Sequence, residues 1–153
     1  MNAKKDSELV SNRKAFHNYE ILDTFEAGIM LVGTEVKSLR GHHGSLQNAY
    51  VVLLSDGRVI LKNASITPYQ YASVFNHEER RDRQLLLHKR ELETLRKVSE
   101  EKGLTLIPLS FYLKNGKIKV KIATARGKKL YDKREDIKTR EEERKIKRIM
   151  KSH

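Results

Sequence analysis

The residues best suited to chemistry lie between Lys117 and Arg134, in the stretch KIKVKIATARGKKLYDKR. At its start, lysine alternates with isoleucine or valine. Because side chains alternate across a strand, this pattern places Lys117, Lys119 and Lys121 on one face and apolar side chains on the other. A row of ammonium groups leading into a basic segment suits contact with a phosphate backbone. The alternative is an edge strand whose lysines prevent aggregation between sheets.

The overall composition favours a polyanionic partner. The 153 residues suit one domain, and 32 Lys and Arg against 20 Asp and Glu give a formal charge of +12. No apolar run approaches the length of a membrane span, and Met1–Glu8 is polar, without the core of a signal peptide. Cysteine is absent, which excludes disulfides, thiol nucleophiles and zinc–thiolate sites. We therefore expect a nucleic-acid-binding protein of the reducing cytoplasm, with no membrane partner.

Motifs for catalysis are missing from the sequence. There is no phosphate-binding Gly-x-x-x-x-Gly-Lys loop, no Gly-x-Ser-x-Gly elbow and no His-Glu-x-x-His helix. His42 and His43 are adjacent, so their side chains point apart and do not suit a shared metal ion. We expect no enzyme activity, no metal site and no cofactor. The enzyme alternative is a small nuclease or RNA-modifying enzyme using His17, His42 or Glu26.

The elements that position the lysine face are mostly short strands. Asp56-Gly57 and Asn115-Gly116 predict type I′ hairpin turns, since these residues tolerate positive φ angles. Leucine at helical spacing predicts a helix from Leu85 to Gly103, and GTEVKSLRG predicts a short one with Thr34 as N-cap. The expected strands are 16–25, 29–32, 49–54, 58–62, 104–114 and 117–122, with Ile107, Leu109, Phe111 and Leu113 on one face of the fifth.

These elements predict a mainly β fold with two to three helices. Six short antiparallel strands with so little helix favour a small barrel of the oligonucleotide-binding type. We expect a flexible N-terminal arm over residues 1–11, an RNA-binding barrel over 12–127 and a basic C-terminal tail over 128–153. The tail holds eleven Lys or Arg, six Asp or Glu and few apolar residues, so it is expected to be disordered alone.

Several motifs in order along the chain resemble the SsrA-binding (small protein B) family of bacterial trans-translation. They are NRKA at 12–15, FEAG at 25–28, GTEVKSLRG at 33–41, ITPY at 66–69, RQLLLH at 83–88, KVKIATARGKKLYDKR at 119–134 and RIMK at 148–151. The resemblance covers nearly the whole chain after residue 11. Two residues depart from the family pattern: Glu79 stands where a proline is usual, and Gln84 where a lysine is common.

The resemblance implies an adaptor that binds the tRNA-like domain of transfer-messenger RNA (tmRNA). The complex, with alanyl-tmRNA and elongation factor Tu, enters the vacant A site of a stalled ribosome. The barrel replaces the missing anticodon arm. The tail folds as a helix in the empty mRNA channel of the small subunit, contacting its ribosomal RNA. A competing hypothesis is a ribosomal protein or general translation factor with the same barrel.

The predicted site residues form two groups. From the resemblance and from the pattern of cations, the tmRNA-binding group is Glu26, Lys37, Arg40, Arg81, Arg83, Leu86, Lys117, Lys119 and Lys121. The group that the resemblance assigns to the decoding centre and mRNA channel is Gly127, Lys128, Lys129, Tyr131, Asp132, Lys133, Arg134, Lys138, Arg148, Ile149, Met150 and Lys151. Tyr131 is expected to stack on a ribosomal base.

Overall fold

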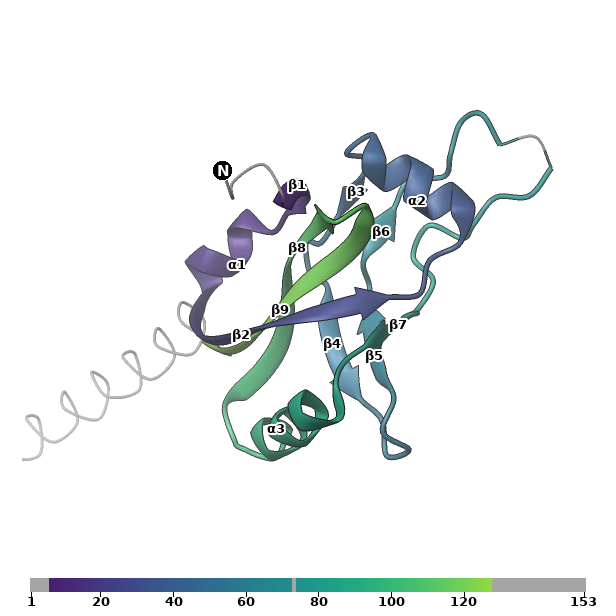
Figure 1. Ribbon diagram of the computed structural model, residues 1–153. Coiled ribbons are helices and arrows are strands. Elements are labelled where there is room, and N and C mark those ends of the chain that lie inside the picture. Colours follow the sequence, from purple (N-terminus) through teal and green to yellow (C-terminus); the bar gives the residue numbers. More distant parts are fainter. Residues whose placement is uncertain (1–5, 73, 128–153) are drawn as a thin grey trace, which may run out of the picture.

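A closed ring of six antiparallel strands forms the body of the protein (Figure 1). The structure, a computed structural model, describes residues 6–72 and 74–127. Around the ring, β9 pairs with β2, then β7, β5, β4 and β8 follow, and β8 pairs again with β9. The six strands are β2 (Tyr19–Ile29), β4 (Tyr50–Leu53), β5 (Val59–Lys62), β7 (Arg83–Leu86), β8 (Leu104–Lys114) and β9 (Lys117–Gly127). The ring confirms the predicted mainly β barrel.

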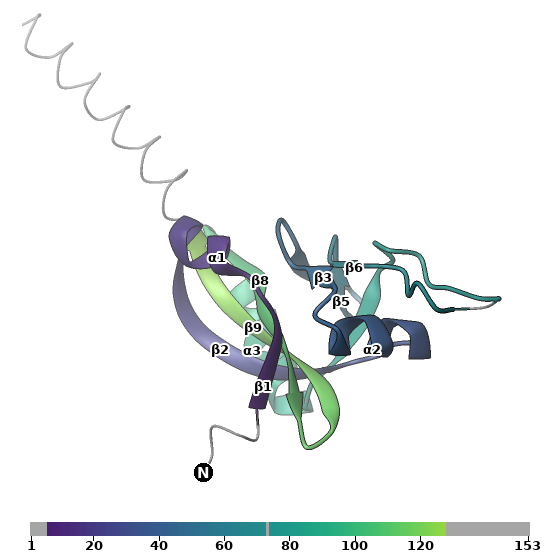
Figure 2. The same cartoon turned by 90° about the horizontal axis from the view of Figure 1, so that it is seen from above.

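Within the described residues, three helices and three short strands complete the fold (Figures 1 and 2). The helices are α1 (Arg13–Asn18), α2 (Gly33–Arg40) and α3 (Lys89–Ser99), and the strands are β1 (Asp6–Ser11), β3 (Gly44–Ser45) and β6 (Ser65–Ile66). β3 pairs with β6, and β1 pairs with the second half of β8. The flexible arm predicted over residues 1–11 is therefore wrong for residues 6–11, where Leu9 and Val10 are buried. The sequence lacked a local signal because this strand depends on its long-range partner.

The interior of the barrel is filled by aliphatic side chains and one fully buried aromatic ring, that of Phe111. Phe111, Val120 and Ile122 are fully buried there, together with Leu61 from β5. Helix α3 adds Leu95, while Leu92 and Val98 are partly buried against the same cluster. The predicted apolar stripe on this helix is confirmed. Its start is wrong, because Leu85 belongs to β7. A run of three leucines fits a short buried strand as well as a helix.

A bulge in β8 changes which side chains face inwards. The register shifts between Pro108 and Ser110, so Leu109 is the extra residue. Ile107 and Leu109 pack in a second cluster with Ala15 of α1, whereas Phe111 lies in the main core. The single face predicted for β8 is therefore wrong beyond this point. The bulge also anchors α1, because the Asn12 amide donates to the Pro108 carbonyl over 2.8 Å.

The turns and caps divide into confirmed and corrected predictions. Asn115 and Gly116 both have positive φ, as a type I′ turn requires. Between β4 and β5 only Gly57 is left-handed, so that hairpin is confirmed but its turn is not type I′. Helix α2 begins after Val32, not Thr34, because Glu35 accepts a hydrogen bond from the Val32 amide over 2.9 Å.

The segment before α2 was also predicted differently. Residues 16–18, expected as the start of a strand, belong to helix α1, and β2 runs unbroken through Gly28 to Ile29. Residues 30–32 then lead directly into α2. Among the helices of the described part, none is long and apolar enough to cross a membrane.

Candidate nucleic-acid interface

Three neighbouring strands place two of the predicted site residues on either side of a glycine. In the register of the barrel, Gly28 of β2 is opposite Leu86 of β7 on one side and Lys119 of β9 on the other. Since glycine has no side chain, the middle of this row is open. The result is a hollow of about 350 Å³, also lined by Glu26, Leu87, His88 and Glu91. Strand pairing thus joins Glu26, Leu86 and Lys119, which are far apart in the sequence.

The carboxylate of Glu26 is held in place by neighbours on β8. The Tyr112 hydroxyl donates to Glu26 Oε1 over 2.7 Å, and Lys114 Nζ lies 3.2 Å from the carboxylate. The hydrogen bond from Tyr112 lowers the pKa of Glu26, and Lys114 and Lys119 lower it further. Glu26 is therefore a charged, oriented acceptor at the edge of the hollow, and suits a hydroxyl or amino group of a nucleotide.

The lysine face of β9 lies on the outside of the closed barrel. Lys117 and Lys121 are exposed and Lys119 is half-buried, while Ile118 and Val120 between them are buried. This alternation confirms the predicted strand face. The edge-strand explanation is wrong, because β9 pairs with β2 on one side and β8 on the other. Lysines that do not protect an edge favour the alternative, contact with a polyanion.

Leu86 provides an apolar contact beside these charges. It is 52% exposed, whereas the preceding Leu85 is only 3% exposed because it points into the barrel. A large exposed aliphatic side chain between charged groups is costly to leave in water. It suits the face of a base or a sugar. The hollow therefore combines an anion, a cation and an apolar surface within one short row.

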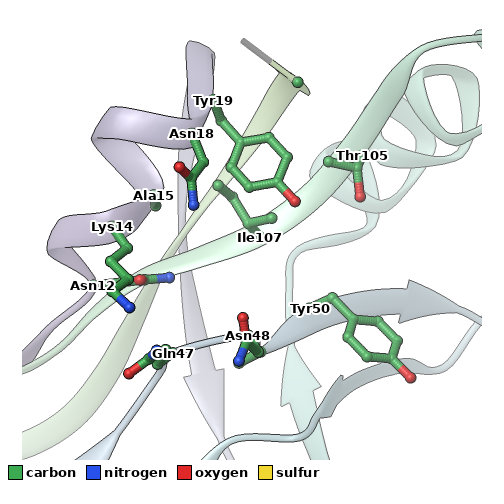
Figure 3. A pocket seen from close by; sticks show the side chains of 12 residues that line it. Asn12, Lys14, Ala15, Asn18, Tyr19, Gln47, Asn48, Tyr50, Thr105 and Ile107 are labelled. Atoms are coloured by element: carbon green, nitrogen blue, oxygen red, sulfur yellow. The ribbon is translucent and has the colours of Figure 1, made fainter. Parts of the chain in front are cut away.

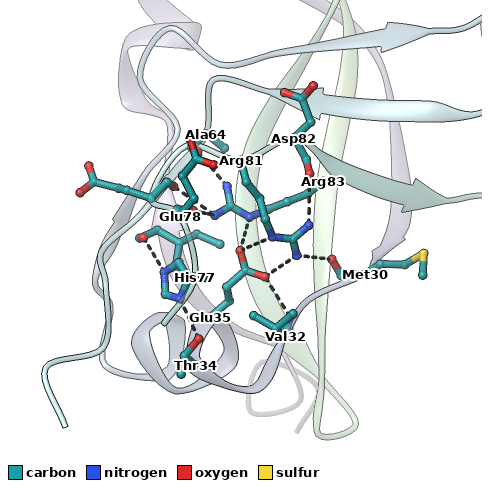
Figure 4. A network of polar contacts seen from close by, with 12 residues as sticks. Met30, Val32, Thr34, Glu35, Ala64, His77, Glu78, Arg81, Asp82 and Arg83 are labelled. Carbon is teal, nitrogen blue, oxygen red and sulfur yellow. Dashed lines mark hydrogen bonds and ion pairs between the residues drawn. The ribbon is translucent and has the colours of Figure 1, made fainter. Parts of the chain in front are cut away.

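Arg83 has a structural role instead of an RNA-contacting one (Figure 4). Its side chain is completely buried, and Nε donates to Glu35 Oε2 over 2.6 Å. The remaining donors of its guanidinium group point to the carbonyl oxygens of Ala64, Glu78 and Glu79. A buried arginine with all its bonds made inside the protein cannot reach a phosphate. Arg83 is therefore removed from the predicted RNA-binding group.

Glu35 is the residue that sequence reasoning missed. It lies in the first turn of α2, and its side chain is fully buried between Arg83 and Arg81. Burial acts to raise its pKa, but hydrogen bonds from Arg81, from the Val32 amide and from Arg83 outweigh it, and the pKa is lowered. The charged triad ties α2 to β7 and to the loop before β7 (Figure 4). The sequence offered two arginines and a glutamate, but no sign of which would pair.

Arg81, Lys37 and Arg40 lie outside the hollow. Arg81 is partly exposed and shared between Glu35 and the Met30 carbonyl. Lys37 lies 5.5 Å above the ring of Tyr69, and Arg40 reaches towards the Gly116 carbonyl at 3.5 Å. Lys37 and Arg40 are both exposed on α2. However, these cations surround other parts of the barrel and do not line the Glu26 hollow.

A second, larger hollow was not predicted from the sequence (Figure 3). It measures about 620 Å³ and combines amide and tyrosine side chains from α1, β2 and the segment before β4. Its lining includes Asn12, Lys14, Asn18, Tyr19, Gln47, Asn48 and Tyr50, and also Gly127 at the end of β9. Tyr19 pairs with Gly127, nine positions from the pairing of Gly28 with Lys119. At 3.3 Å per residue the two hollows are therefore separated by roughly 30 Å along β2.

Gly127 is the last residue that the structure describes before the C-terminus. The remaining residues predicted for the decoding centre and mRNA channel lie outside the described residues: Lys128, Lys129, Tyr131, Asp132, Lys133, Arg134, Lys138, Arg148, Ile149, Met150 and Lys151.

The histidines considered for catalysis lie on different elements, His17 in α1 and His42 just after α2. His42 Nδ1 donates to the Leu9 carbonyl over 3.0 Å, which ties the end of α2 to β1. In residues 6–72 and 74–127 there is no cluster of three or more His, Asp or Glu side chains suited to a metal ion.

Comparison with known proteins identifies the family. The SmpB protein family model matches residues 9–152. The SsrA-binding protein of Protochlamydia amoebophila is 52% identical over 147 residues, covering 96% of this chain and 95% of that protein. That of Chlamydia muridarum is 55% identical over 144 residues, covering 94% and 95%. The chain belongs to the SmpB family.

The SmpB resemblance extends to three dimensions. A solved structure described as "tmRNA-SmpB: a journey to the center of the bacterial ribosome" matches with a TM-score of 0.67 and 49% identity. The match covers 78% of this chain and 84% of the other. The family predicted from the sequence motifs is therefore confirmed, and the barrel described above is the SmpB barrel.

Proposed function

We propose that this protein is the RNA-binding adaptor of trans-translation, which binds the tRNA-like domain of tmRNA. The observation that carries the proposal is the convergence of Glu26, Leu86 and Lys119 in one hollow on a basic barrel. The same three residues are those that the resemblance to the SmpB family assigns to RNA binding. In this proposal the protein recognises and delivers an RNA and catalyses no reaction. Because it acts on the ribosome, we expect it in the cytoplasm.

Each group in the hollow has a separate role in the proposed recognition. The lysine face of β9 neutralises phosphates, which provides affinity that falls with rising salt. Glu26, held by Tyr112, accepts hydrogen bonds from sugar hydroxyl or base amino groups. Leu86 covers a base or ribose face. The Glu26 carboxylate gives selectivity, since it repels a phosphate and binds only a hydrogen-bond donor that lies in the correct place.

The other end of the β2–β9 ladder is proposed to face the small ribosomal subunit. There the chain leaves the barrel at Gly127 and enters the basic tail, and the second hollow lies at the same end. Residues 128–153 then occupy the decoding centre and the empty mRNA channel, reading vacancy by charge and by helix formation. This length of strand, roughly 30 Å measured along β2, lets one small barrel contact two RNAs at its two ends.

Elongation factor Tu enters the proposal only through the bound RNA. We expect it to hold the alanylated acceptor arm of tmRNA, so its association with this protein is indirect. A preparation without tmRNA should therefore show no complex between the two proteins in gel filtration.

A competition gel shift tests the main proposal. Labelled tRNA-like domain of tmRNA is bound at physiological salt and challenged with excess bulk tRNA. Survival of the complex supports a specific adaptor. Ready displacement would favour the competing hypothesis, a general translation factor with the same barrel.

Two variants connect the result to the hollow. Leu86→Ala should abolish resistance to the competitor. Leu22→Ala should not, although it also removes an exposed leucine, 41% accessible, from β2. If both variants resist the competitor equally well, or equally badly, the RNA does not bind at this hollow.

A further inference from the structure

The loop between β6 and β7 presents large apolar side chains to solvent. Tyr71 is 74% exposed, Val74 78% and Phe75 85%. The loop projects away from the barrel in both views (Figures 1 and 2). Exposed aromatic side chains lose free energy in water and mark interaction sites when several gather together. The Glu26 hollow contains none of these residues.

The base of this loop is fixed to the barrel. The Asn76 side chain forms two hydrogen bonds with Tyr69, accepting from its amide over 3.1 Å and donating to its carbonyl over 2.9 Å. The Ser38 hydroxyl of α2 donates to the Thr67 carbonyl over 2.7 Å. These bonds clamp the two ends of the loop together. The exposed side chains are therefore presented from a defined base.

His77 provides a second anchor. Its Nε2 lies 2.8 Å from the Ile66 carbonyl, which can only accept, so Nε2 carries the proton. Nδ1 then accepts from the Thr34 hydroxyl, also over 2.8 Å. The residue is buried, with 9% of its surface exposed. One imidazole thus joins α2 to both sides of the loop.

Positive charge accompanies the aromatic rings. Lys37 lies 5.5 Å from the centre of the Tyr69 ring, and Tyr69 meets Tyr71 edge to face at 5.6 Å. Arg40 follows Lys37 by one turn on the same exposed face of α2, and Arg80 is exposed near the C-terminal end of the loop. Glu78 and Glu79 are the neighbouring exposed acids, but Glu79 is bonded to the Ser65 hydroxyl.

We propose that Tyr71 and Phe75 form a stacking platform for unpaired bases of an RNA whose backbone meets Lys37 and Arg40. Aromatic rings interleaved with cations are the common design of single-strand binding surfaces, since every base has a π face. RNA is favoured over a protein partner because cations flank the rings and the chain carries a charge of +12. This inference rests on the proposed RNA-binding function and adds a second contact region to it.

A tryptophan reporter tests the stacking directly. The chain contains no tryptophan, so Phe75→Trp introduces a single emission signal. The matched control is Phe16→Trp in α1, at a phenylalanine that is 55% exposed. Each full-length variant is titrated with single-stranded oligouridylate and with an RNA duplex of equal length. We expect quenching only for the Phe75→Trp reporter with the single strand. Equal quenching of both reporters, or none, overturns the platform.

Affinity measurements separate stacking from simple apolar contact. By anisotropy with labelled oligouridylate, Phe75→Ala and Tyr71→Ala should each weaken binding roughly five- to a hundred-fold. Phe16→Ala should leave it within twofold. Phe75→Leu keeps apolar area without a π face, so it should weaken binding nearly as much as alanine. Full affinity of the leucine variant would overturn base stacking and favour a protein partner for the loop.

The failure of this inference is distinguishable from failure of the proposed function. Wild-type binding to the tRNA-like domain tests the function, whereas the loop variants are compared only with wild type. If wild type binds that RNA specifically and the loop variants bind oligouridylate unchanged, the adaptor proposal stands and the platform is wrong.

Discussion

Removing the carboxylate of Glu35 should destabilise the barrel strongly. The Glu35→Ala variant leaves Arg83 buried without its anion, and Arg83 cannot lose its charge at any ordinary pH. Burial also lowers the pKa of Arg83, but Glu35 opposes that effect, so the pair keeps the arginine charged. The same substitution removes the acceptor for Arg81 and for the Val32 amide at the start of α2.

The magnitude follows from which bonds remain. Arg83 retains hydrogen bonds to the carbonyls of Ala64, Glu78 and Glu79, but no compensating charge. Breaking a buried ion pair by removing one partner typically costs about 3–5 kcal/mol. Replacing both charges with apolar groups is often neutral or stabilising. We therefore expect Glu35→Ala to cost about 3–5 kcal/mol, and Glu35→Leu combined with Arg83→Met to cost clearly less.

Urea unfolding followed by circular dichroism measures these differences. With a slope of about 1–3 kcal/mol per molar urea, a loss of this size moves the midpoint by more than 1 M or unfolds the chain. Arg81→Ala is the control, because that side chain is partly exposed and exposed pairs contribute only about 0–1 kcal/mol. The reasoning is refuted if Glu35→Ala is no worse than Arg81→Ala, or if the double variant loses the sum of its two single losses.

Three further predictions concern pH, salt and the exposed leucine. The folded-state pKa of Glu35 lies below its ordinary value of 4.5, so its contribution to stability is complete above that value and is lost as pH falls through the folded pKa. Unfolding midpoints of Glu35→Gln should therefore depend less on pH below about 5 than those of wild type. Lys119→Gln should reduce the slope of log affinity for RNA against log salt by about 0.7–0.9, and Lys102→Gln, at an exposed lysine after α3, should not. Leu86→Ala should weaken RNA binding while changing the free energy of unfolding by less than about 0.5 kcal/mol, because the side chain is 52% exposed; a large loss in thermal unfolding would contradict this.

The sequence predicted those elements whose causes are local. The Asn115-Gly116 turn, the alternating lysines of β9 and the leucine stripe of α3 each depend on residues within a few positions. Helix α1 and strand β1 depend instead on β8, through the Asn12 bond to Pro108 and the pairing with residues 110–114. The periodicity of apolar residues reports only on neighbours in the sequence, so it gives no sign of partners that are about a hundred positions away. The same reason explains the missed bulge at Leu109.

The site was predicted from the family resemblance and from the pattern of cations, and one of its residues was then corrected by burial. Glu26, Leu86 and Lys119 were identified separately, and strand register brings them together. Arg83 has the same charge as Arg81 and stands two positions later, which in a strand places both on one side. Only the tertiary structure reveals that Arg83 reaches a buried glutamate. A surface arginine and a structural arginine have the same sequence signal.

The closed barrel explains how a small chain can face two RNAs without a second domain. Because β9 pairs with β2 over residues 119–127 and with β8 over residues 117–126, its two ends are held at a fixed separation. Lys119 lies near one end beside the Glu26 hollow, and Gly127 at the other end begins the path to the tail. The β2–β9 ladder therefore fixes the distance between the proposed tmRNA contact and the proposed ribosome contact. An open sheet would twist and bend between these ends, whereas a barrel closed on both edges resists such movement.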